Sequence, residues 1–262
     1  MINEENILEI KNLNVKFELY KNLVEKYEVE VIKNLTLTLK AGEILSIIGA
    51  SGSGKSVLTH SILNLLPKNS KVTGQIKYNG EKIEYKNISK LLGKDISYIP
   101  QSVDYLDPVM KIGKQVLGVS GNYEKMINLF KKYKLPLDIK DKYPFEISGG
   151  MARRVLICAS LMNDPKFLIA DEPTPGVDKN IEKEIIKDFK DISSQNKSIL
   201  IITHNIDFAI NVSDSIAVFL DGNIIEKEEV SKFLSGGNLL ENSYSKSLIK
   251  SLPQNEFESK IF

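Results

Sequence analysis

A glycine-rich octapeptide at residues 49–56 reads GASGSGKS and matches the pattern G-x-x-x-x-G-K-[S/T] in full. It follows the apolar run 41–50 and precedes apolar residues at helical spacing, the strand–loop–helix context of a phosphate-binding loop. Glycines let successive backbone N–H groups turn around a phosphate at the positive end of the helix. We expect Lys55 to reach the β- and γ-phosphate oxygens and the Ser56 hydroxyl to ligate Mg²⁺. The alternative, a flexible Gly/Ser loop that happens to hold a lysine, does not explain these flanking elements.

Two neighbouring carboxylates, Asp171 and Glu172, end the apolar run that begins at Phe167. The carboxyl ends of parallel strands meet at one edge of a sheet, so both groups should emerge beside the phosphate loop. We expect Asp171 to hold Mg²⁺, directly or through water, and Glu172 to polarise the attacking water or accept its proton. An acidic pair that caps the following helix is the alternative, and a complete phosphate loop nearby disfavours it.

The tripeptide Ser148-Gly149-Gly150 precedes a strong helical pattern. Ser148 can therefore be the N-cap of this helix, and the N–H groups of the glycines can form an anion site. The tripeptide is also common in ordinary loops, so taken alone it leaves both readings open. Its position, inside a helical region and upstream of the acidic strand, favours the anion site.

The elements around these residues alternate between strand and helix patterns. Residues 7–20 and 29–40 alternate apolar and polar side chains, as half-buried antiparallel strands do, and an Asn-Gly turn inside 73–83 predicts a hairpin. From about 101 to 165 the strand patterns give way to helical ones, which predicts an inserted helical subdomain. The charged stretch 226–232 is expected to be a solvated turn. Four further strands and one helix complete an α/β pattern with a mainly parallel sheet, namely 95–100, 166–172, 198–204, 214–225 and 179–195.

The bulk composition narrows the classes of protein that the chain can be. Of 262 residues, 42% are hydrophobic and 26% charged, and 35 basic residues balance 34 acidic ones. This balance disfavours a large nucleic-acid footprint, and the single cysteine, Cys158, excludes a disulfide framework or a cysteine-rich metal site. The acidic N-terminus shows no signal peptide, and no apolar run approaches the ~20 residues that span a bilayer. We therefore expect a protein of a reducing, cytosolic compartment that another subunit brings to any membrane it serves.

The motifs, taken in order, resemble those of the ABC cassettes. GASGSGKS stands as Walker A, ISGGM replaces the usual LSGGQ signature, and LIADEPT stands as Walker B. Gln101 resembles the Q-loop glutamine, Asp178 the D-loop aspartate and His204 the switch histidine. The resemblance covers nearly the whole chain, 1–262. It implies a P-loop NTPase with a RecA-like α/β core, an N-terminal antiparallel β-subdomain, a helical subdomain at about 101–165 and a short C-terminal extension at about 231–262.

The resemblance also implies roles for individual residues, with ATP and Mg²⁺ as cofactors. In the family, the serine-glycine motif of one subunit completes the ATP site of a second, so Ser148 would grip the γ-phosphate bound to its partner. His204 would contact the γ-phosphate, and Gln101 would sense Mg²⁺ and the membrane subunit. Tyr27 would stack on the adenine, although Tyr20 and Phe17 compete for this role. The catalytic residues so implied are Lys55, Glu172 and His204. The metal-binding residues are Ser56, Gln101 and Asp171. The nucleotide-binding residues are Tyr27, Gly49, Ser51, Gly52, Ser53, Gly54, Lys55, Ser56, Val57, Gln101, Ser148, Gly149, Gly150, Met151 and Asp178.

Four segments are similar to the peptide/nickel importer cassettes, and SGGMARRV and DEPTPGVD look particularly like the nickel and metallophore branch. These are YIPQSVDYLDPVMKIG at residues 98–113, the pair SGGMARRV and DEPTPGVD, and the C-terminal YSKSLIKSLPQNEF. The chain departs from the usual pattern at Ile147, Met151 and Arg153, where many cassettes carry Leu, Gln and Gln. It also lacks the Cys-rich tail of longer members, so no Fe–S cluster is implied.

This subgroup implies a set of partners. They are a second cassette, paralogous in a heterodimer or identical in a homodimer, two transmembrane permeases and, indirectly, an extracytoplasmic binding protein. No nucleic acid is implied, and the chain would lie at the cytoplasmic face of the cell membrane. Two alternatives stay open at this point. One is a non-transport ABC ATPase that acts with soluble partners, and the other is a cassette that holds ATP but barely hydrolyses it.

Overall fold

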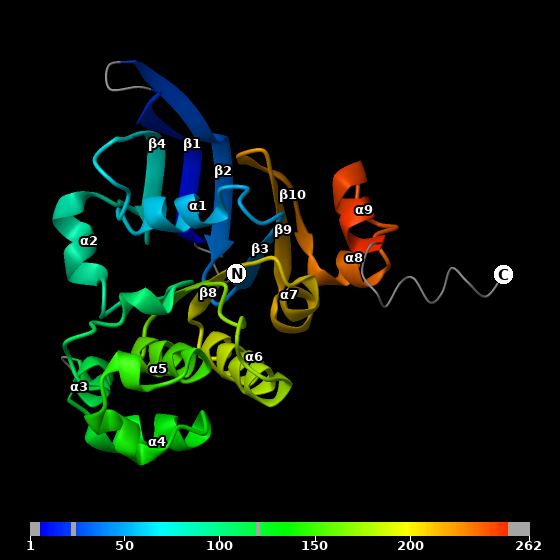
Figure 1. Cartoon of the computed structure of the whole chain (residues 1–262). Helices are drawn as coiled ribbons and strands as arrows, with labels where there is room; N and C mark the ends of the chain where they lie inside the picture. Colours follow the sequence, from blue (N-terminus) through cyan, green and yellow to red (C-terminus); the bar gives the residue numbers. More distant parts are fainter. Residues whose placement is uncertain (1–5, 22–24, 119–120, 251–262) are drawn as a thin grey trace.

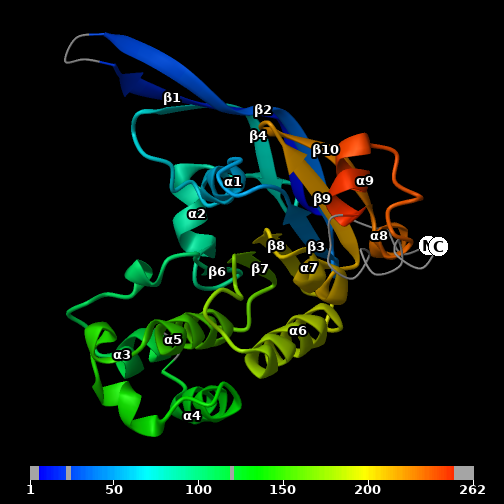
Figure 2. The ribbon, with the colours of Figure 1, turned by 45° about the vertical axis from the view of Figure 1, so that its right-hand side comes forward.

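A computed structural model describes residues 6–21, 25–118 and 121–250, and its strands form two sheets (Figure 1). The smaller sheet is antiparallel and has the order β2-β1-β4-β5. Its strands are β1 (Asn6–Tyr20), β2 (Lys26–Lys40), β4 (Ser70–Tyr78) and β5 (Glu81–Lys82). The two long strands β1 and β2 extend beyond the rest of this sheet (Figure 2). The antiparallel pairing predicted for the N-terminal half and the hairpin around Asn79-Gly80 are both confirmed.

The larger sheet has the order β10-β9-β3-β8-β7-β6, and every pair except β10 with β9 is parallel. Its strands are β3 (Ile44–Ile48), β6 (Ile96–Ile99), β7 (Phe167–Asp171), β8 (Ser198–Thr203), β9 (Ser215–Leu220) and β10 (Asn223–Glu229). Every residue of β3, β7 and β8 is buried, as expected for strands covered on both faces. The predicted α/β class with a mainly parallel sheet is thus confirmed.

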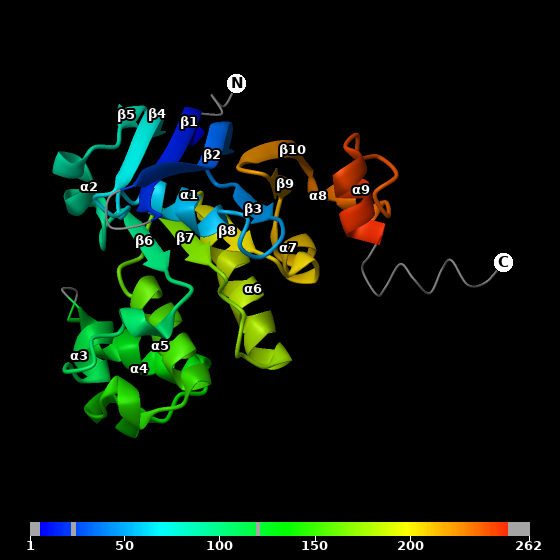
Figure 3. The same cartoon turned by 45° about the horizontal axis from the view of Figure 1, so that its top comes forward.

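Two apolar clusters cover the two faces of this sheet. One joins it to the antiparallel sheet and to α1 (Lys55–Ile62), for example through Leu8, Leu45 and Leu58. The other joins the opposite face to helices on the far side, for example through Ile44, Ile157 and Phe189. Figures 1 and 3 show α3, α4 and α5 gathered on that far side, away from the antiparallel sheet. The helices concerned are α3 (Ile112–Leu117), α4 (Tyr123–Lys132), α5 (Gly149–Leu161) and α6 (Lys179–Ser193).

Residues 101–118 and 121–165 contain only helical elements, as the sequence pattern predicts. Besides α3, α4 and α5 they are the 3₁₀ turns η1 (Val103–Tyr105), η2 (Leu137–Asp141) and η3 (Pro144–Glu146). The division of the chain into subdomains stays a prediction. In the part of the chain that the structure describes, no helix is both long and apolar enough to cross a membrane.

The expected turn at 226–232 is wrong. Residues 223–229 form β10, an edge strand antiparallel to β9, and Val230–Leu234 forms α8. Edge strands tolerate charged side chains because one side stays in water. Here Lys227 Nζ lies 3.2 Å from a carboxylate oxygen of Glu43 and donates to the carbonyl of Thr38 at 2.8 Å. The charges at 226–229 are therefore those of a half-buried strand with polar partners.

Besides α8, three other short helices were not predicted. They are α2 (Tyr85–Leu91), α7 (Ile206–Val212) and α9 (Ser243–Lys250). Both α8 and α9 lie beside β9 and β10 (Figures 1 and 3) and contribute Phe233 and Ile249 to a third apolar cluster with Val218. The predicted C-terminal extension is thus packed on the sheet as far as residue 250, and its last twelve residues lie outside the described residues.

Candidate functional site

The glycine-rich loop connects β3 to α1 and is closely packed against β9. A Cβ atom on Gly49 would lie 2.4 Å from the carbonyl oxygen of Phe219, so only glycine fits between the two strands. Gly54 is the N-cap of α1 and has a φ of 107°, a left-handed conformation that glycine adopts readily. The sequence places glycine where this backbone requires it.

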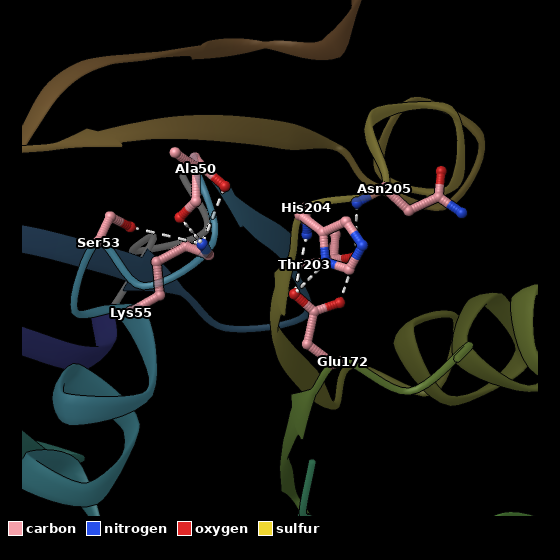
Figure 4. Close-up of polar contacts among 8 residues, drawn as sticks. Ala50, Ser53, Lys55, Glu172, Thr203, His204 and Asn205 are labelled. Carbon is pink, nitrogen blue, oxygen red and sulfur yellow. Dashed lines mark hydrogen bonds and ion pairs between the residues drawn. The ribbon is translucent and has the colours of Figure 1, made fainter. Parts of the chain in front are cut away.

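Lys55, the first residue of α1, folds back over the loop. Its Nζ donates to the carbonyl oxygens of Gly49 at 2.9 Å and Ala50 at 2.8 Å (Figure 4). The side chain is buried, which lowers its pKa, while the charges of Glu172 and Asp171 act in the opposite direction. A buried cation held inside an anion-binding loop is suited to phosphate oxygens.

A cavity of about 270 Å³ opens beside this loop. Its wall brings together segments that are far apart in the sequence, including Gln101, which follows β6, and Glu172, which follows β7. Lys55 and Glu172 both line it, and Figure 4 shows them on separate elements, α1 and the end of β7. The residues that line it are Ser51, Gly52, Gly54, Lys55, Ser56, Val57, Gln101, Glu172 and Ile202. The residues predicted to bind phosphate and the strand-end carboxylate predicted to act on water thus share one site.

Asp171 ends β7 with its side chain almost fully enclosed, at 1% exposure. Neither carboxylate oxygen has a partner of normal hydrogen-bond geometry among the described residues. Burial raises the pKa of Asp171 to about 6, Glu172 adds to the rise, and the nearby Ser56 hydroxyl, Lys55 and Arg153 oppose it. A buried carboxylate with two unsatisfied oxygens beside a serine hydroxyl is the oxygen donor set that Mg²⁺ prefers. Asp171 and Ser56 therefore fit the implied metal ion.

Glu172 is held by residues at the end of β8. Its Oε1 accepts the backbone N–H of His204 at 3.0 Å and lies 2.7 Å from His204 Nδ1, while Thr203 Oγ1 donates to Oε2 at 3.2 Å (Figure 4). The backbone of Glu172 has a φ of 47°, a strained conformation for a non-glycine residue that is often found at functional sites. The carboxylate is thereby fixed at the cavity wall, and the His204 ring, 58% exposed, lies beside it.

The serine-glycine motif begins α5. Ser148 is its N-cap, with Oγ accepting the N–H of Met151 at 3.3 Å, as the sequence predicts. A Cβ on Gly150 would lie 2.8 Å from the carbonyl oxygen of Gly176, whereas Gly149 faces open space. Asp178 caps α6 and accepts N–H groups of that helix. Ser148, Gly149, Gly150, Met151 and Asp178 do not line the cavity that holds Lys55.

Tyr27 is also outside the cavity lining. It lies on β2, opposite Leu19 of β1, and its side chain is exposed. The residue of β2 that adjoins Gly54 of the loop is Val31, whose Cγ1 lies 2.8 Å from the position of a Cβ on Gly54. Four residues of strand place Tyr27 roughly 13 Å further along β2. The ring of Tyr20 is covered by the Lys26 ammonium at 5.3 Å, so the aromatic partner of adenine stays a prediction.

Three residues at the site were missed by sequence reasoning. Val31 adjoins the loop, Thr203 positions Glu172, and Ile202 lines the cavity. Thr203 and Ile202 directly precede His204, so their place at the end of a buried strand was available as a signal. Val31 offers none, because its role depends on how the two sheets pack together.

A phosphate-binding loop and two strand-end carboxylates on a parallel sheet define a P-loop nucleoside triphosphatase. A family model described as "ABC transporter" matches residues 32–175, more than half of the chain. The oligopeptide transport ATP-binding protein OppD of Bacillus subtilis is 34% identical, over 97% of this chain and 74% of the relative. The dipeptide transport ATP-binding protein DppD of Lactococcus lactis is 32% identical, over 95% and 74%.

Solved structures agree with these relatives. The dimeric structure of MJ0796, a bacterial ABC transporter cassette, matches with a TM-score of 0.73 and 25% identity, over 85% of this chain and 98% of that one. The structure of cbiO1 from Clostridium perfringens, part of the ABC transporter complex cbiONQ, matches with a TM-score of 0.70 and 26% identity, over 98% and 100%. The chain belongs to the ABC transporter family, as one of its ATP-hydrolysing cassettes.

Proposed function

We propose that this chain is the ATP-hydrolysing subunit of a membrane importer that takes up peptides. The observation that carries the proposal is the Glu172 carboxylate, which His204 and Thr203 hold at the wall of the cavity that contains Lys55. The relatives named for oligopeptide and dipeptide transport support peptides as the substrate class. Nickel or a metal chelate is the second candidate, supported by the resemblance of SGGMARRV at 148–155 and DEPTPGVD at 171–178 to the nickel and metallophore branch.

In the proposed mechanism, the N–H groups of the loop and the Lys55 ammonium bind the β- and γ-phosphates of ATP. Ser56 and Asp171 would hold Mg²⁺, with Gln101 beside them, and the ion supplies positive charge that neutralises the phosphate oxygens. Glu172 accepts a proton from the attacking water, and the exposed ring of His204 contacts the γ-phosphate. The bonds from His204 and Thr203 keep Glu172 in place while it does so.

In this mechanism, Ser148, Gly149 and Gly150 of this chain complete the ATP site of the second cassette in a dimer. Their absence from the lining of the cavity in their own chain supports this assignment. The dimeric MJ0796 cassette provides a precedent for pairing. Two transmembrane permeases, which the cassettes contact at the cytoplasmic face of the membrane, and an extracytoplasmic binding protein complete the proposed assembly. Closure of the cassettes around ATP then drives the permeases, and hydrolysis reopens them.

Reconstitution of the assembled subunits in liposomes tests this proposal. Peptide uptake should require internal Mg²⁺ and ATP and should stimulate ATP hydrolysis above its basal rate. A parallel uptake assay with nickel and a nickel chelate distinguishes the second substrate class. Uptake of neither class, together with recovery of the chain only with soluble proteins, would instead support a non-transport ATPase.

A further inference from the structure

Helix α5 holds the end of the edge strand β6 and the residues that follow it. Arg153, only 7% exposed, donates through Nη1 to the carbonyl oxygen of Pro100 at 2.6 Å and through Nη2 to that of Gln101. Ser160, two turns further along α5, donates to the carbonyl oxygen of Tyr98 at 2.7 Å. Three backbone carbonyls within four residues are thus bound by side chains of one helix.

A guanidinium at this buried position requires compensation, because a charge removed from water is costly unless it is paired. The carbonyl oxygens of Pro100 and Gln101 provide part of this compensation, and the negative charges of Asp171 and Glu172 contribute further. Burial lowers the pKa of Arg153, and these carboxylates act against that effect. The Nε atom of Arg153 has no hydrogen-bond partner among the described residues, so its two Nη atoms make all the polar contacts found there.

The same helix begins at the serine-glycine motif. Arg153 lies five residues after Ser148, about 7.5 Å along the axis of a rigid helix. Gln101, whose backbone Arg153 holds, lines the cavity with Lys55 and Ser56. A shift of α5 that seats Ser148 against a partner therefore also shifts Gln101 in the cavity of its own chain.

We infer that Arg153 is a positioning residue that ties Gln101 to the helix carrying the serine-glycine motif, and so links the chain's own ATP site to the one it completes in its partner. This inference rests on the proposed function. Many cassettes of the resembled family carry glutamine at this place. A glutamine amide is neutral, shorter and has one donor nitrogen, so it cannot bridge the two carbonyls as a guanidinium fork does.

Amide hydrogen exchange of the full chain without nucleotide tests the structural part. Arg153→Gln should increase exchange in the segment 98–106 by about tenfold or more, because glutamine cannot replace both charge-assisted hydrogen bonds and the loss of one is worth about that factor. Arg153→Lys keeps the charge but has a single nitrogen, so its exchange rate should fall between those of the wild type and Arg153→Gln. Arg154→Gln is the matched control, since Arg154 binds the carbonyls of Gly150, Tyr133 and Lys134 and none of residues 98–101.

Calorimetric titrations with ATP at several Mg²⁺ concentrations test the effect on the site. The measured quantity is the Mg²⁺ concentration that gives half of the Mg²⁺-dependent gain in ATP affinity. It should rise severalfold in Arg153→Gln and stay near the wild-type value in Arg154→Gln. Equal exchange and equal Mg²⁺ dependence in the two variants would overturn the inference, and so would wild-type behaviour of both Arg153 variants. Because exchange needs no turnover, a wild-type complex that does not hydrolyse ATP would count against the proposed function alone.

Discussion

Both oxygens of the Glu172 carboxylate accept hydrogen bonds, from His204 and Thr203, and these bonds fix the orientation of the group at the cavity wall. Each carboxylate oxygen can accept more than one bond, so the group can still bind a water on its cavity side. With His204 Nδ1 as a donor, the carboxylate is held in a fixed orientation. The geometry therefore suits a general base with a fixed orientation. His204 is its hydrogen-bond partner, and the exposed part of the His204 ring stays accessible to a ligand.

Replacing this base should separate binding from turnover. Glu172→Gln keeps the size of the side chain and its hydrogen bond from Thr203 but removes the basic oxygen. ATP affinity measured by calorimetry should stay close to wild type. Turnover of the assembled complex should fall by about 10²–10⁴-fold, the usual contribution of a general base. A wild-type rate of hydrolysis in this variant would show that the assigned role is wrong.

Removal of the buried cation should affect binding first. Lys55→Ala deletes the ammonium that lies among the loop carbonyls, and ATP affinity should fall by about ten- to a hundredfold because charge-assisted hydrogen bonds to phosphate are lost. Lys232→Ala removes an exposed lysine paired with Glu228 and serves as the control. Unchanged calorimetric affinity in Lys55→Ala would contradict the assignment of the loop.

The site residues that local spacing defines could be predicted, and those that tertiary packing defines could not. Gly49, Lys55 and Ser56 follow a fixed motif, and Asp171 and Glu172 end an unmistakable buried strand. Their roles follow from the elements that flank them. The contacts of Val31 with the loop and of Arg153 with Gln101 join segments 23 and 52 residues apart, and no local pattern encodes such distances.

At the scale of elements, the same division appears in the strands. Strands buried on both faces, such as β7 and β8, were predicted within a residue or two because their apolar runs are continuous. The edge strand β10 was missed because its charged side chains, among them Lys227 and Glu228, resemble those of a turn. An edge strand tolerates charged residues because one of its edges is exposed to solvent and because a neighbouring sheet supplies polar partners. Neither condition can be inferred from a sequence window of seven residues.

The fit between β3 and β9 gives a prediction for stability. Gly49→Ala places a methyl group 2.4 Å from the carbonyl oxygen of Phe219, so the two strands must separate. The free energy of unfolding should fall by about 1–3 kcal/mol, as for other overpacked sites. Gly149→Ala adds the same methyl group at a helical position with open space and should leave this free energy nearly unchanged. Denaturant unfolding of the isolated chain measures both, and an equal loss in the two variants would contradict the packing argument.

At the scale of the whole molecule, two groups of residues, each proposed to form half of an ATP site, do not meet within the chain. The cavity around Lys55 contains the residues proposed to bind and hydrolyse ATP, while Ser148, Gly149 and Gly150 begin a helix outside its wall. The net charge is close to zero, with 35 basic and 34 acidic residues, and does not restrict the partner to one sign of charge. Pairing of two cassettes, identical or paralogous, is what would bring the half-sites together.

Complementation between two inactive variants tests this pairing. Ser148→Arg places a bulky cation where the γ-phosphate of the partner's ATP is proposed to bind, and Lys55→Ala disables the loop. In a homodimer, each variant alone should lack hydrolysis. A mixture should regain it in part, because a mixed dimer joins the intact loop of the Ser148→Arg chain to the intact motif of the Lys55→Ala chain. With a paralogous partner, Ser148→Arg should instead block photolabelling by an azido-ATP at the partner's loop and spare labelling at Lys55.

The capping role of Ser148 must be separated from the steric block. Ser148→Ala removes the oxygen that accepts the Met151 N–H and should cost about 0.5–2 kcal/mol of stability without adding bulk. It should therefore leave more ATP bound at the partner's loop than Ser148→Arg does, at equal amounts of folded protein. If Ser148→Arg abolishes binding at the loop of its own chain, or if the mixture regains no hydrolysis and the partner's loop labels normally, the motif acts within one chain. The dimeric mechanism would then have to be abandoned, because closure of two cassettes around shared ATP depends on a motif supplied by the partner.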